Sequence, residues 1–203
     1  MNKRHALRWI SVAAAAAAVG LLGACSEKKV SFNGVDITGA EYARDFPLQD
    51  PQGKPRSLKE FAGKVVVVFF GYTQCPDVCP TTLQELAEVR QALGADGERL
   101  QGVFITVDPQ RDTPEVLQAY MASFDPSFVA LRGTPEQLAA VAKDFKIYYK
   151  KVEGKTPTSY TMDHSAGSYV YDPEGHLRVY QRYGSGAQAL TADVRALLQE
   201  RKR

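Results

Sequence analysis

The feature that most restricts how this chain can fold is the segment at residues 64–70, which reads KVVVVFF and is apolar without interruption after its first lysine. β-Branched and aromatic residues in a row, without alternating polar residues, are typical of a strand that is buried on both faces. A second segment of the same kind reads VFITV at residues 103–107. Two such strands predict a central sheet with helices on both faces.

Helix signals follow each of these strands. Residues 80–90 begin with proline and then place leucine or valine at every third position, which predicts a helix. The tripeptide Thr-Pro-Glu opens residues 113–124 and again residues 134–145. A capping threonine, a proline at the first helical position and an early acid predict two more helices there. The amphipathic residues 187–199 predict a last helix.

Two pairs of shorter strands are predicted in the second half of the chain. Residues 146–151 and 159–162 flank a polar link that contains glycine and proline, whereas residues 167–171 and 176–182 flank the turn Asp-Pro-Glu-Gly. The element order predicts an α/β protein with a thioredoxin-like fold. Its central mixed sheet is flanked by helices, and a β-hairpin is inserted before the loop that carries His164.

The N-terminus has the pattern of a targeting signal. A basic start is followed by an apolar run of 16 residues, shorter than the ~20 that a membrane-spanning helix needs. The run ends in LGAC, which resembles the lipobox of bacterial lipoproteins and implies lipidation of Cys25. We therefore predict a signal peptide at 1–24, a lipid-anchored tether at 25–40 and a folded domain at 41–203, on the periplasmic side of a bacterial membrane. The alternative is a secreted soluble protein that is cleaved nearby.

The length, net charge and cysteine count of the chain exclude several classes of protein. A length of 203 residues favours one domain, and a formal net charge of +2 gives no electrostatic basis for binding nucleic acid. Three cysteines are too few for a disulfide scaffold in a chain of this length. If Cys25 is the lipid anchor, the other two cysteines form a pair.

That pair, Cys75 and Cys79, lies in the segment TQCPDVCP between the first buried strand and its helix. Positions i and i+4 on a helical turn lie ~5–6 Å apart, so both sulfurs can face one side. Cys79 stands at the helix start, where free N–H groups are expected to favour a thiolate. Two thiolates can close into a disulfide or hold a soft metal ion such as copper(I). The pair alone leaves redox, metal-binding and structural roles open.

A histidine, His164, supplies a third candidate ligand in the loop before the strand at 167–171. The other histidine after residue 25, His176, lies in a turn and is predicted to be exposed to solvent. Met162 could also serve as a soft ligand, although a core role at the end of a strand is the preferred interpretation.

Three separated motifs resemble the Sco/SenC family of copper chaperones: TQCPDVCP at 73–80, TVDPQRDTP at 106–114 and DHS at 163–165. The resemblance covers roughly residues 40 to 200. It implies a thioredoxin-like domain in which two cysteines and one histidine bind a copper ion. It also implies a role in the assembly of cytochrome c oxidase, whose copper-bearing subunit would be the partner.

Within this resemblance the ligand motif is carried over onto Cys75, Cys79 and His164. Asp77, between the cysteines, is a candidate for tuning their redox behaviour or contacts with a partner. Asp108, Arg111 and Asp112 are expected to shape the neighbouring loop, with an Arg–Asp pair that fixes a turn.

Other functions would use the same cysteines. Their oxidation to a disulfide would remove both sulfur ligands, so a thioredoxin-like reductant is an expected partner. Another copper carrier is a further candidate partner. The leading alternative is a thiol–disulfide reductase that reduces the cysteines of the oxidase copper site. Thioredoxin-type reductases usually have two residues between their cysteines and a proline before the facing strand. This chain has three residues and no proline in 162–169, which favours metal binding over reduction. A peroxidase of the same fold would not need the histidine. Two cysteines and one histidine would suit only an open catalytic zinc site, and no general base for one is evident.

Overall fold

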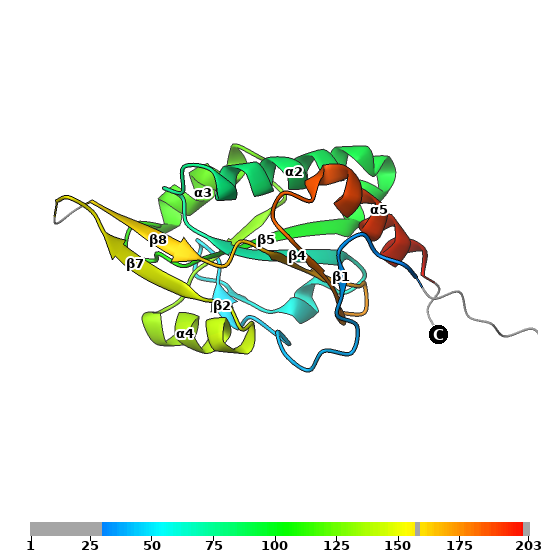
Figure 1. The fold of residues 1–203 in the computed structure, drawn as a ribbon, viewed down its shortest axis with the longest axis horizontal. Helices are drawn as coiled ribbons and strands as arrows, with labels where there is room; N and C mark the ends of the chain where they lie inside the picture. The colour runs from blue at the N-terminus through cyan, green and yellow to red at the C-terminus, as the bar shows by residue number, and fades with distance from the viewer. Residues whose placement is uncertain (1–29, 157–158, 201–203) are drawn as a thin grey trace, which may run out of the picture. The chain divides into compact units, whose positions relative to one another are not determined.

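The central sheet contains six strands, in the order β1-β10-β9-β4-β5-β6 (Figure 1). They are β1 (Val35–Asp36), β4 (Val65–Gly71), β5 (Leu100–Thr106), β6 (Val129–Leu131), β9 (Ser168–Tyr171) and β10 (Leu177–Gln181). The computed structural model describes residues 30–156 and 159–200. β4, β5 and β6 run parallel to one another. β9 is antiparallel to β4, β10 is antiparallel to β9, and β1 is antiparallel to β10. The sheet is therefore mixed, as predicted.

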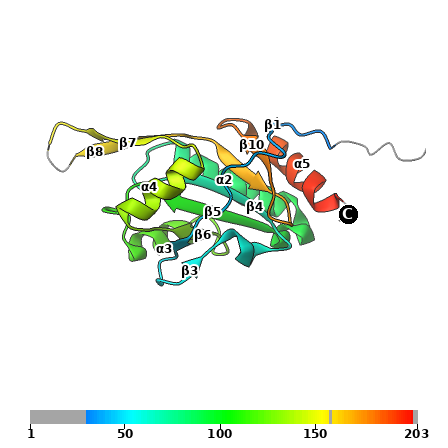
Figure 2. The ribbon, with the colours of Figure 1, turned by 90° about the horizontal axis from the view of Figure 1, so that it is seen from below.

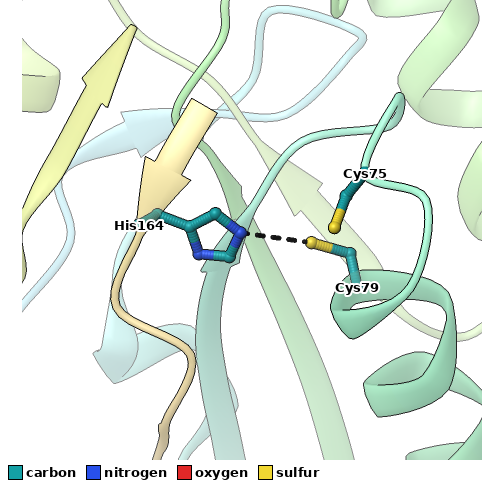
Figure 3. A group of neighbouring side chains, drawn as sticks. All are labelled: Cys75, Cys79 and His164. Carbon is teal, nitrogen blue, oxygen red and sulfur yellow. Dashed lines mark hydrogen bonds between the residues drawn. The ribbon is translucent and has the colours of Figure 1, made fainter. Parts of the chain in front are cut away.

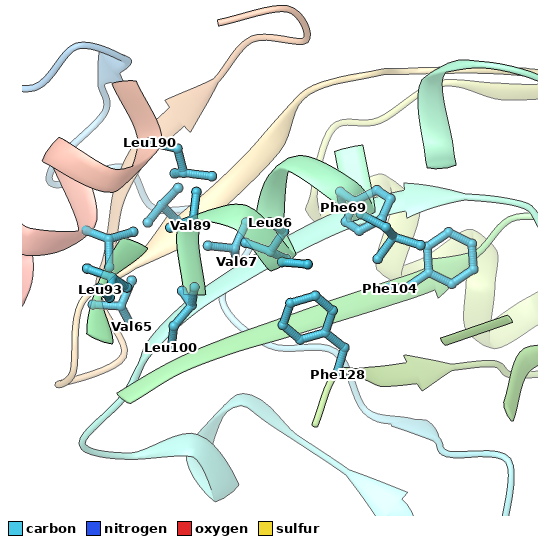
Figure 4. Close-up of a cluster of buried hydrophobic side chains, with 14 of the residues drawn as sticks. Val65, Val67, Phe69, Leu86, Val89, Leu93, Leu100, Phe104, Phe128 and Leu190 are labelled. Atoms are coloured by element: carbon cyan, nitrogen blue, oxygen red, sulfur yellow. The ribbon is translucent and has the colours of Figure 1, made fainter. Parts of the chain in front are cut away.

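Helices cover both faces of the sheet (Figures 1 and 2). They are α2 (Val78–Ala92), α3 (Pro114–Ala122), α4 (Pro135–Asp144) and α5 (Gly186–Gln199), with the 3₁₀ helices η1 (Leu58–Phe61) and η2 (Gly94–Arg99). β4 is buried along its whole length. Its odd-numbered residues pack with α2, α3 and α5 in one apolar cluster, shown in Figure 4, and its even-numbered residues pack with α4 and η1 in another. Burial on both faces explains the uninterrupted apolar sequence of this strand.

The predicted helix starts on Thr-Pro-Glu are confirmed. The Thr113 hydroxyl accepts a hydrogen bond from the Val116 N–H at the start of α3. At α4 the Thr134 hydroxyl accepts from the Gln137 N–H, and the Gln137 side chain accepts from the Thr134 N–H. These bonds satisfy N–H groups that the first turn of a helix leaves free.

The strands of the inserted β-hairpin lie one to three residues further along the chain than the sequence pattern indicates. The hairpin consists of β7 (Tyr149–Glu153) and β8 (Tyr160–His164), which pair with each other and not with the central sheet. His164 is thus the last residue of a strand, paired with Tyr149, rather than part of a loop. A second small hairpin, β2 (Leu48–Gln49) with β3 (Pro55–Arg56), and the short strands β1 and β6 were not predicted.

The folded unit begins earlier than the predicted boundary at residue 41. It starts at Ser31, and β1 adds an edge strand to the sheet by pairing with β10. The backbone N–H groups of Asn33 and Gly34 donate to the carboxylate of Asp193 on α5, at 2.7 and 2.9 Å. The tether prediction over 25–40 is therefore wrong for its last residues, because they are bound to β10 and α5.

The predicted signal peptide at 1–24 and the predicted lipidation site Cys25 lie outside the described residues. Among residues 30–156 and 159–200, no helix has the length and apolar character to cross a membrane.

Candidate metal site

Cys75, Cys79 and His164 converge at one end of the central sheet, although the histidine follows Cys79 by 85 residues (Figure 3). Their ligand atoms, two sulfurs and one ring nitrogen, all lie within 4.8 Å of one another. The Cys79 Sγ and His164 Nε2 atoms are 3.6 Å apart. Both cysteines are free thiols, so their sulfurs are available to a metal.

Cys79 is buried in the first turn of α2, which begins two residues before the predicted start at Pro80. The sulfur packs closely on the end of β4. A Cβ atom on Gly71 would lie 2.5 Å from Cys79 Sγ and 2.8 Å from a ring carbon of Phe104. Only glycine at this position lets the start of α2 approach the sheet so closely, because any side chain would occupy the place of the sulfur.

Burial raises the pKa of the Cys79 thiol well above its ordinary value, and the nearby Cys75 raises it further. The expectation that the helix start favours a thiolate at Cys79 is therefore wrong for the metal-free protein. Removing the side chain from water disfavours the charged form more than the free N–H groups of the helix favour it. Cys79 is a neutral thiol at neutral pH, and a metal ion must displace its proton to bind.

The ring of His164 is oriented by the residue that follows it. Its Nδ1 atom lies 3.0 Å from the carbonyl oxygen of Ser165, and two hydrogen bonds with Tyr148 hold Ser165 in place. A carbonyl can only accept, so Nδ1 carries the proton and Nε2 presents its lone pair toward Cys79. Tyr72 packs edge-on against the ring, with centroids 5.9 Å apart. The imidazole is thus preset as a nitrogen ligand.

The loop after β5 supports the cysteine loop, as predicted. Arg111 forms an ion pair with Asp108. Asp112 is fully buried and accepts hydrogen bonds from the Thr73 backbone N–H, the Thr73 hydroxyl and the Thr106 hydroxyl. Thr73 lies two residues before Cys75, so the buried carboxylate holds the start of the cysteine loop.

The remaining candidates lie around this group. Asp77 is exposed just before α2, where its carboxylate accepts from Thr81 and Tyr183. Met162 is half-buried against the second apolar cluster, in agreement with the preferred core role. His176 is exposed, as predicted, and its Nδ1 atom lies 3.4 Å from an Asp172 oxygen.

The sequence does not single out the residues that support the three candidate ligands, which are Gly71, Tyr72, Tyr160 and Ser165. The one available signal is Gly71, the glycine that ends a buried strand. A glycine in a strand often marks a place where another segment comes close.

The fold and the site together define a thioredoxin-like α/β protein with a Cys-Cys-His group. The family model described as SCO1/SenC matches residues 35–199, and the chain belongs to this family.

Relatives of known sequence and structure agree. The chain is 39% identical over 132 residues to a SCO2-like protein of Rickettsia felis, covering 64% of each chain. It is 36% identical over 153 residues to the mitochondrial SCO2 homolog of Bos taurus, covering 74% of this chain and 58% of the relative. The chain therefore spans about 60% of the length of these curated relatives.

Two solved structures are similar to this chain over three quarters of its length or more. Copper-bound ScoI of Bradyrhizobium japonicum is 40% identical, with a TM-score of 0.68, and the match covers 75% of this chain and 97% of that one. Apo Sco1 of Thermus thermophilus is 38% identical, with a TM-score of 0.74, and the match covers 84% and 99%.

Proposed function

We propose that Cys75, Cys79 and His164 bind one copper ion, and that the protein delivers copper to the copper-bearing subunit of cytochrome c oxidase during assembly. The observation that carries the proposal is the convergence of two thiols and one preset imidazole nitrogen within 4.8 Å. The similar ScoI of Bradyrhizobium japonicum is described with copper bound. Membership of the SCO1/SenC family adds support for a role in oxidase assembly, because the Sco family is described as one of cytochrome c oxidase assembly proteins.

The chemistry of the donor set suits copper in both oxidation states. With metal–sulfur bonds of about 2.3 Å and metal–nitrogen bonds of about 2.0 Å, the values for zinc, one ion can span donor atoms at most about 4.3 to 4.6 Å apart. The group within 4.8 Å is therefore close to the size that one ion needs. Thiolates favour Cu(I), and imidazole is a good ligand for Cu(II). Two thiolates would therefore suffice for Cu(I), while Cu(II) binding would need His164 as well.

The burial of the two cysteines suggests a direction for transfer. Cys79 is fully buried, whereas Cys75 is half-buried. A ligand of the receiving subunit would approach from the side of Cys75 and replace that sulfur first. Release of the metal from Cys79 and His164 would follow by further ligand exchange.

The alternative function is that of a thiol–disulfide reductase. The difference in burial favours it as well, because the more exposed Cys75 could attack a target while the buried Cys79 waits to close the disulfide. Cys75 would attack a disulfide of the target, and Cys79 would then close the Cys75–Cys79 disulfide. Two electrons and two protons would pass to the target thiols. A thioredoxin-like reductant would then supply the two electrons and two protons that restore the thiols, and another copper carrier would deliver copper to the reduced target.

Copper titration of the reduced protein under anaerobic conditions tests the proposal. We expect Cu(I) binding to require both cysteines, and Cu(II) binding to fall by at least about tenfold in His164→Ala. His176→Ala is the matched control, because it removes an exposed histidine outside the site. Cu(II) binding that is equal in both histidine variants would refute the ligand set. Rapid reduction of an oxidised oxidase-subunit fragment by the metal-free protein, independent of His164, would favour the reductase.

We also propose that the protein is anchored by a lipid at Cys25 on the periplasmic side of a bacterial membrane. The basic start, the short apolar run and the LGAC sequence support this location. A similar protein of Bacillus anthracis, 25% identical with a TM-score of 0.65, is described as a SCO1/SenC family lipoprotein. Mass spectrometry of the membrane-extracted protein would detect the lipid, and Cys25→Ser is expected to release the protein from membranes.

A further inference from the structure

The strand that carries His164 is not held by the central sheet. β7 and β8 form a separate two-stranded ribbon that extends beyond the sheet (Figures 1 and 2). Two-stranded hairpins are only marginally stable by themselves in water. Contacts between this hairpin and the body must therefore fix the position of the His164 ring relative to the two sulfurs.

One face of β8 turns toward the body. Tyr160, Met162 and His164 are half-buried, while the alternate residues Thr161 and Asp163 are exposed. Alternate residues of a strand share a face, at about 3.3 Å per residue, so Tyr160 and His164 lie about 13 Å apart on the same face. A contact at Tyr160 therefore fixes the tilt of the strand that ends in the ligand.

Arg111 makes that contact and reaches the cysteine loop as well. Its Nη1 atom donates to the backbone carbonyl of Tyr160 at 2.9 Å and to the side-chain oxygen of Gln74 at 3.0 Å. Gln74 directly precedes Cys75 in the chain. The guanidinium also stacks on the Tyr160 ring, with Cζ 3.5 Å from the centroid. One side chain thus joins the strand of the histidine to the loop of the cysteines.

The guanidinium is itself held in a fixed orientation. Its Nε atom donates to one carboxylate oxygen of Asp108, and the Tyr160 hydroxyl donates to the other at 2.9 Å. The side chain of Arg111 is 17% exposed and that of Asp108 is 4% exposed, so water competes little for these bonds. The arrangement uses the planar fork of arginine, which lysine cannot reproduce.

We propose that Arg111 is a positioning residue that sets how closely His164 Nε2 approaches the two sulfurs. It thereby controls the affinity for Cu(II), which needs the imidazole, separately from the affinity for Cu(I), which needs only the cysteines. This inference rests on the copper ligand set proposed above.

The variant Arg111→Lys keeps the positive charge and loses the fork. We expect its Cu(II) affinity to fall about 10- to 100-fold, as when an outer residue that orients a ligand is lost. Its Cu(I) affinity is expected to stay within about threefold, because the cysteine pair is retained. In a His164→Ala background, Arg111→Lys is expected to change Cu(II) binding no further, since it acts through the imidazole.

Arg178→Lys is the matched control. Arg178 is another sheltered arginine, 13% exposed, and it is bound to Asp172 and Glu200 by ion pairs away from the cysteine loop. We expect this variant to lose a similar amount of stability and to bind both copper ions like the wild type. An equal loss of Cu(II) affinity in both arginine variants would overturn the inference.

A measurement without metal completes the test. In the metal-free wild type, NMR should detect cross-relaxation between the rings of Tyr72 and His164, whose centroids are 5.9 Å apart. We expect Arg111→Lys to weaken these signals and Arg178→Lys to leave them unchanged. Unchanged signals in Arg111→Lys, or the same Cu(II) loss with and without His164, would overturn the positioning role. Cu(II) binding that is unaffected by His164→Ala in the otherwise wild-type protein would instead refute the proposed ligand set.

Discussion

Replacing Gly71 by alanine tests whether the metal site depends on the close approach of Cys79 to the central sheet. The new Cβ atom would lie 2.5 Å from Cys79 Sγ, about 1 Å short of ordinary contact, which begins at 3.4 Å. It would also lie 2.8 Å from a ring carbon of Phe104. Gly71 is paired with Thr106 in the parallel ladder between β4 and β5, so the backbone of the strand has little freedom to move.

The start of α2 must therefore give way. Forcing an extra methyl group into a packed core costs about 1–3 kcal/mol of unfolding free energy. Cys79 Sγ would also move by about 1 Å from a position in which it lies 3.6 Å from His164 Nε2. We expect this displacement to weaken Cu(I) binding about 10- to 100-fold, comparable to the loss of a residue that orients a metal ligand.

Gly102→Ala provides a matched control on the neighbouring strand. A Cβ atom there would lie 2.7 Å from a Leu86 methyl carbon and 2.8 Å from the ring of Phe128, both in the core and away from the cysteines. Urea unfolding would measure the stability of both variants, and competition with a chromophoric Cu(I) chelator would measure affinity. We expect similar losses of stability, with loss of copper affinity only in Gly71→Ala.

Two results would refute this reasoning. If Gly71→Ala is destabilised but binds Cu(I) like the wild type, the position of Cys79 does not depend on the contact with β4. If both glycine variants lose the same copper affinity, the loss reflects general damage to the core and not displacement of one ligand.

Three further predictions follow from buried polar groups. Because burial keeps Cys79 protonated, Cu(I) loading near pH 7 is expected to release at least one proton per metal, measurable with a pH indicator in weak buffer. Tyr171→Phe removes a buried hydroxyl that donates to the Ala43 carbonyl at 2.6 Å, and should cost about 1–3 kcal/mol in urea unfolding because that carbonyl loses its partner. Burial by itself would raise the pKa of Asp50, but backbone N–H groups and Arg56 outweigh it and lower the pKa. The stability contributed by ionised Asp50 is therefore present above pH 3.8 and lost as the pH falls through the lowered pKa, so wild type and Asp50→Asn should converge in acid.

Elements stabilised by their own sequence were predictable. β4 is apolar along its whole length, and β5 has the apolar run Val103–Ile105, because both faces of these strands are buried and no alternation with polar residues is needed. α3 and α4 begin at capping threonines that act within one turn of the helix. In each case the physical cause lies in the segment itself.

Elements stabilised by distant residues could not be predicted in the same way. β1 and β6 contain two and three residues, too few for any periodicity. β1 is held by β10 and by the neighbouring bonds to Asp193, some 160 positions along the chain. The failure of the tether prediction therefore has the same cause as the failure to find these strands.

The candidate site also combines features with a local cause, which were predictable, and features that depend on distant residues, which were not. Sequence motifs predicted Cys75, Cys79 and His164 as ligands because residue type is a local property of the sequence, and the structure brings the three together. The prediction for the ionisation of Cys79 is wrong, because the pKa depends on burial of the sulfur against Gly71, which the local argument from the helix start does not include.

Burial also explains why the site would combine two sulfurs with a neutral nitrogen. In the proposed complexes, two thiolates with Cu(I) carry a net charge of −1, whereas two thiolates and an imidazole with Cu(II) are neutral. The buried environment that keeps Cys79 protonated also disfavours the negative charge of the Cu(I) complex. Burial therefore offsets part of the preference of the two sulfurs for Cu(I). His164, with its proton held on Nδ1 by the Ser165 carbonyl, adds a ligand without adding charge. On the proposed ligand set, the protein would hold both oxidation states only while the hairpin keeps this nitrogen within reach, which is the role that we propose for Arg111.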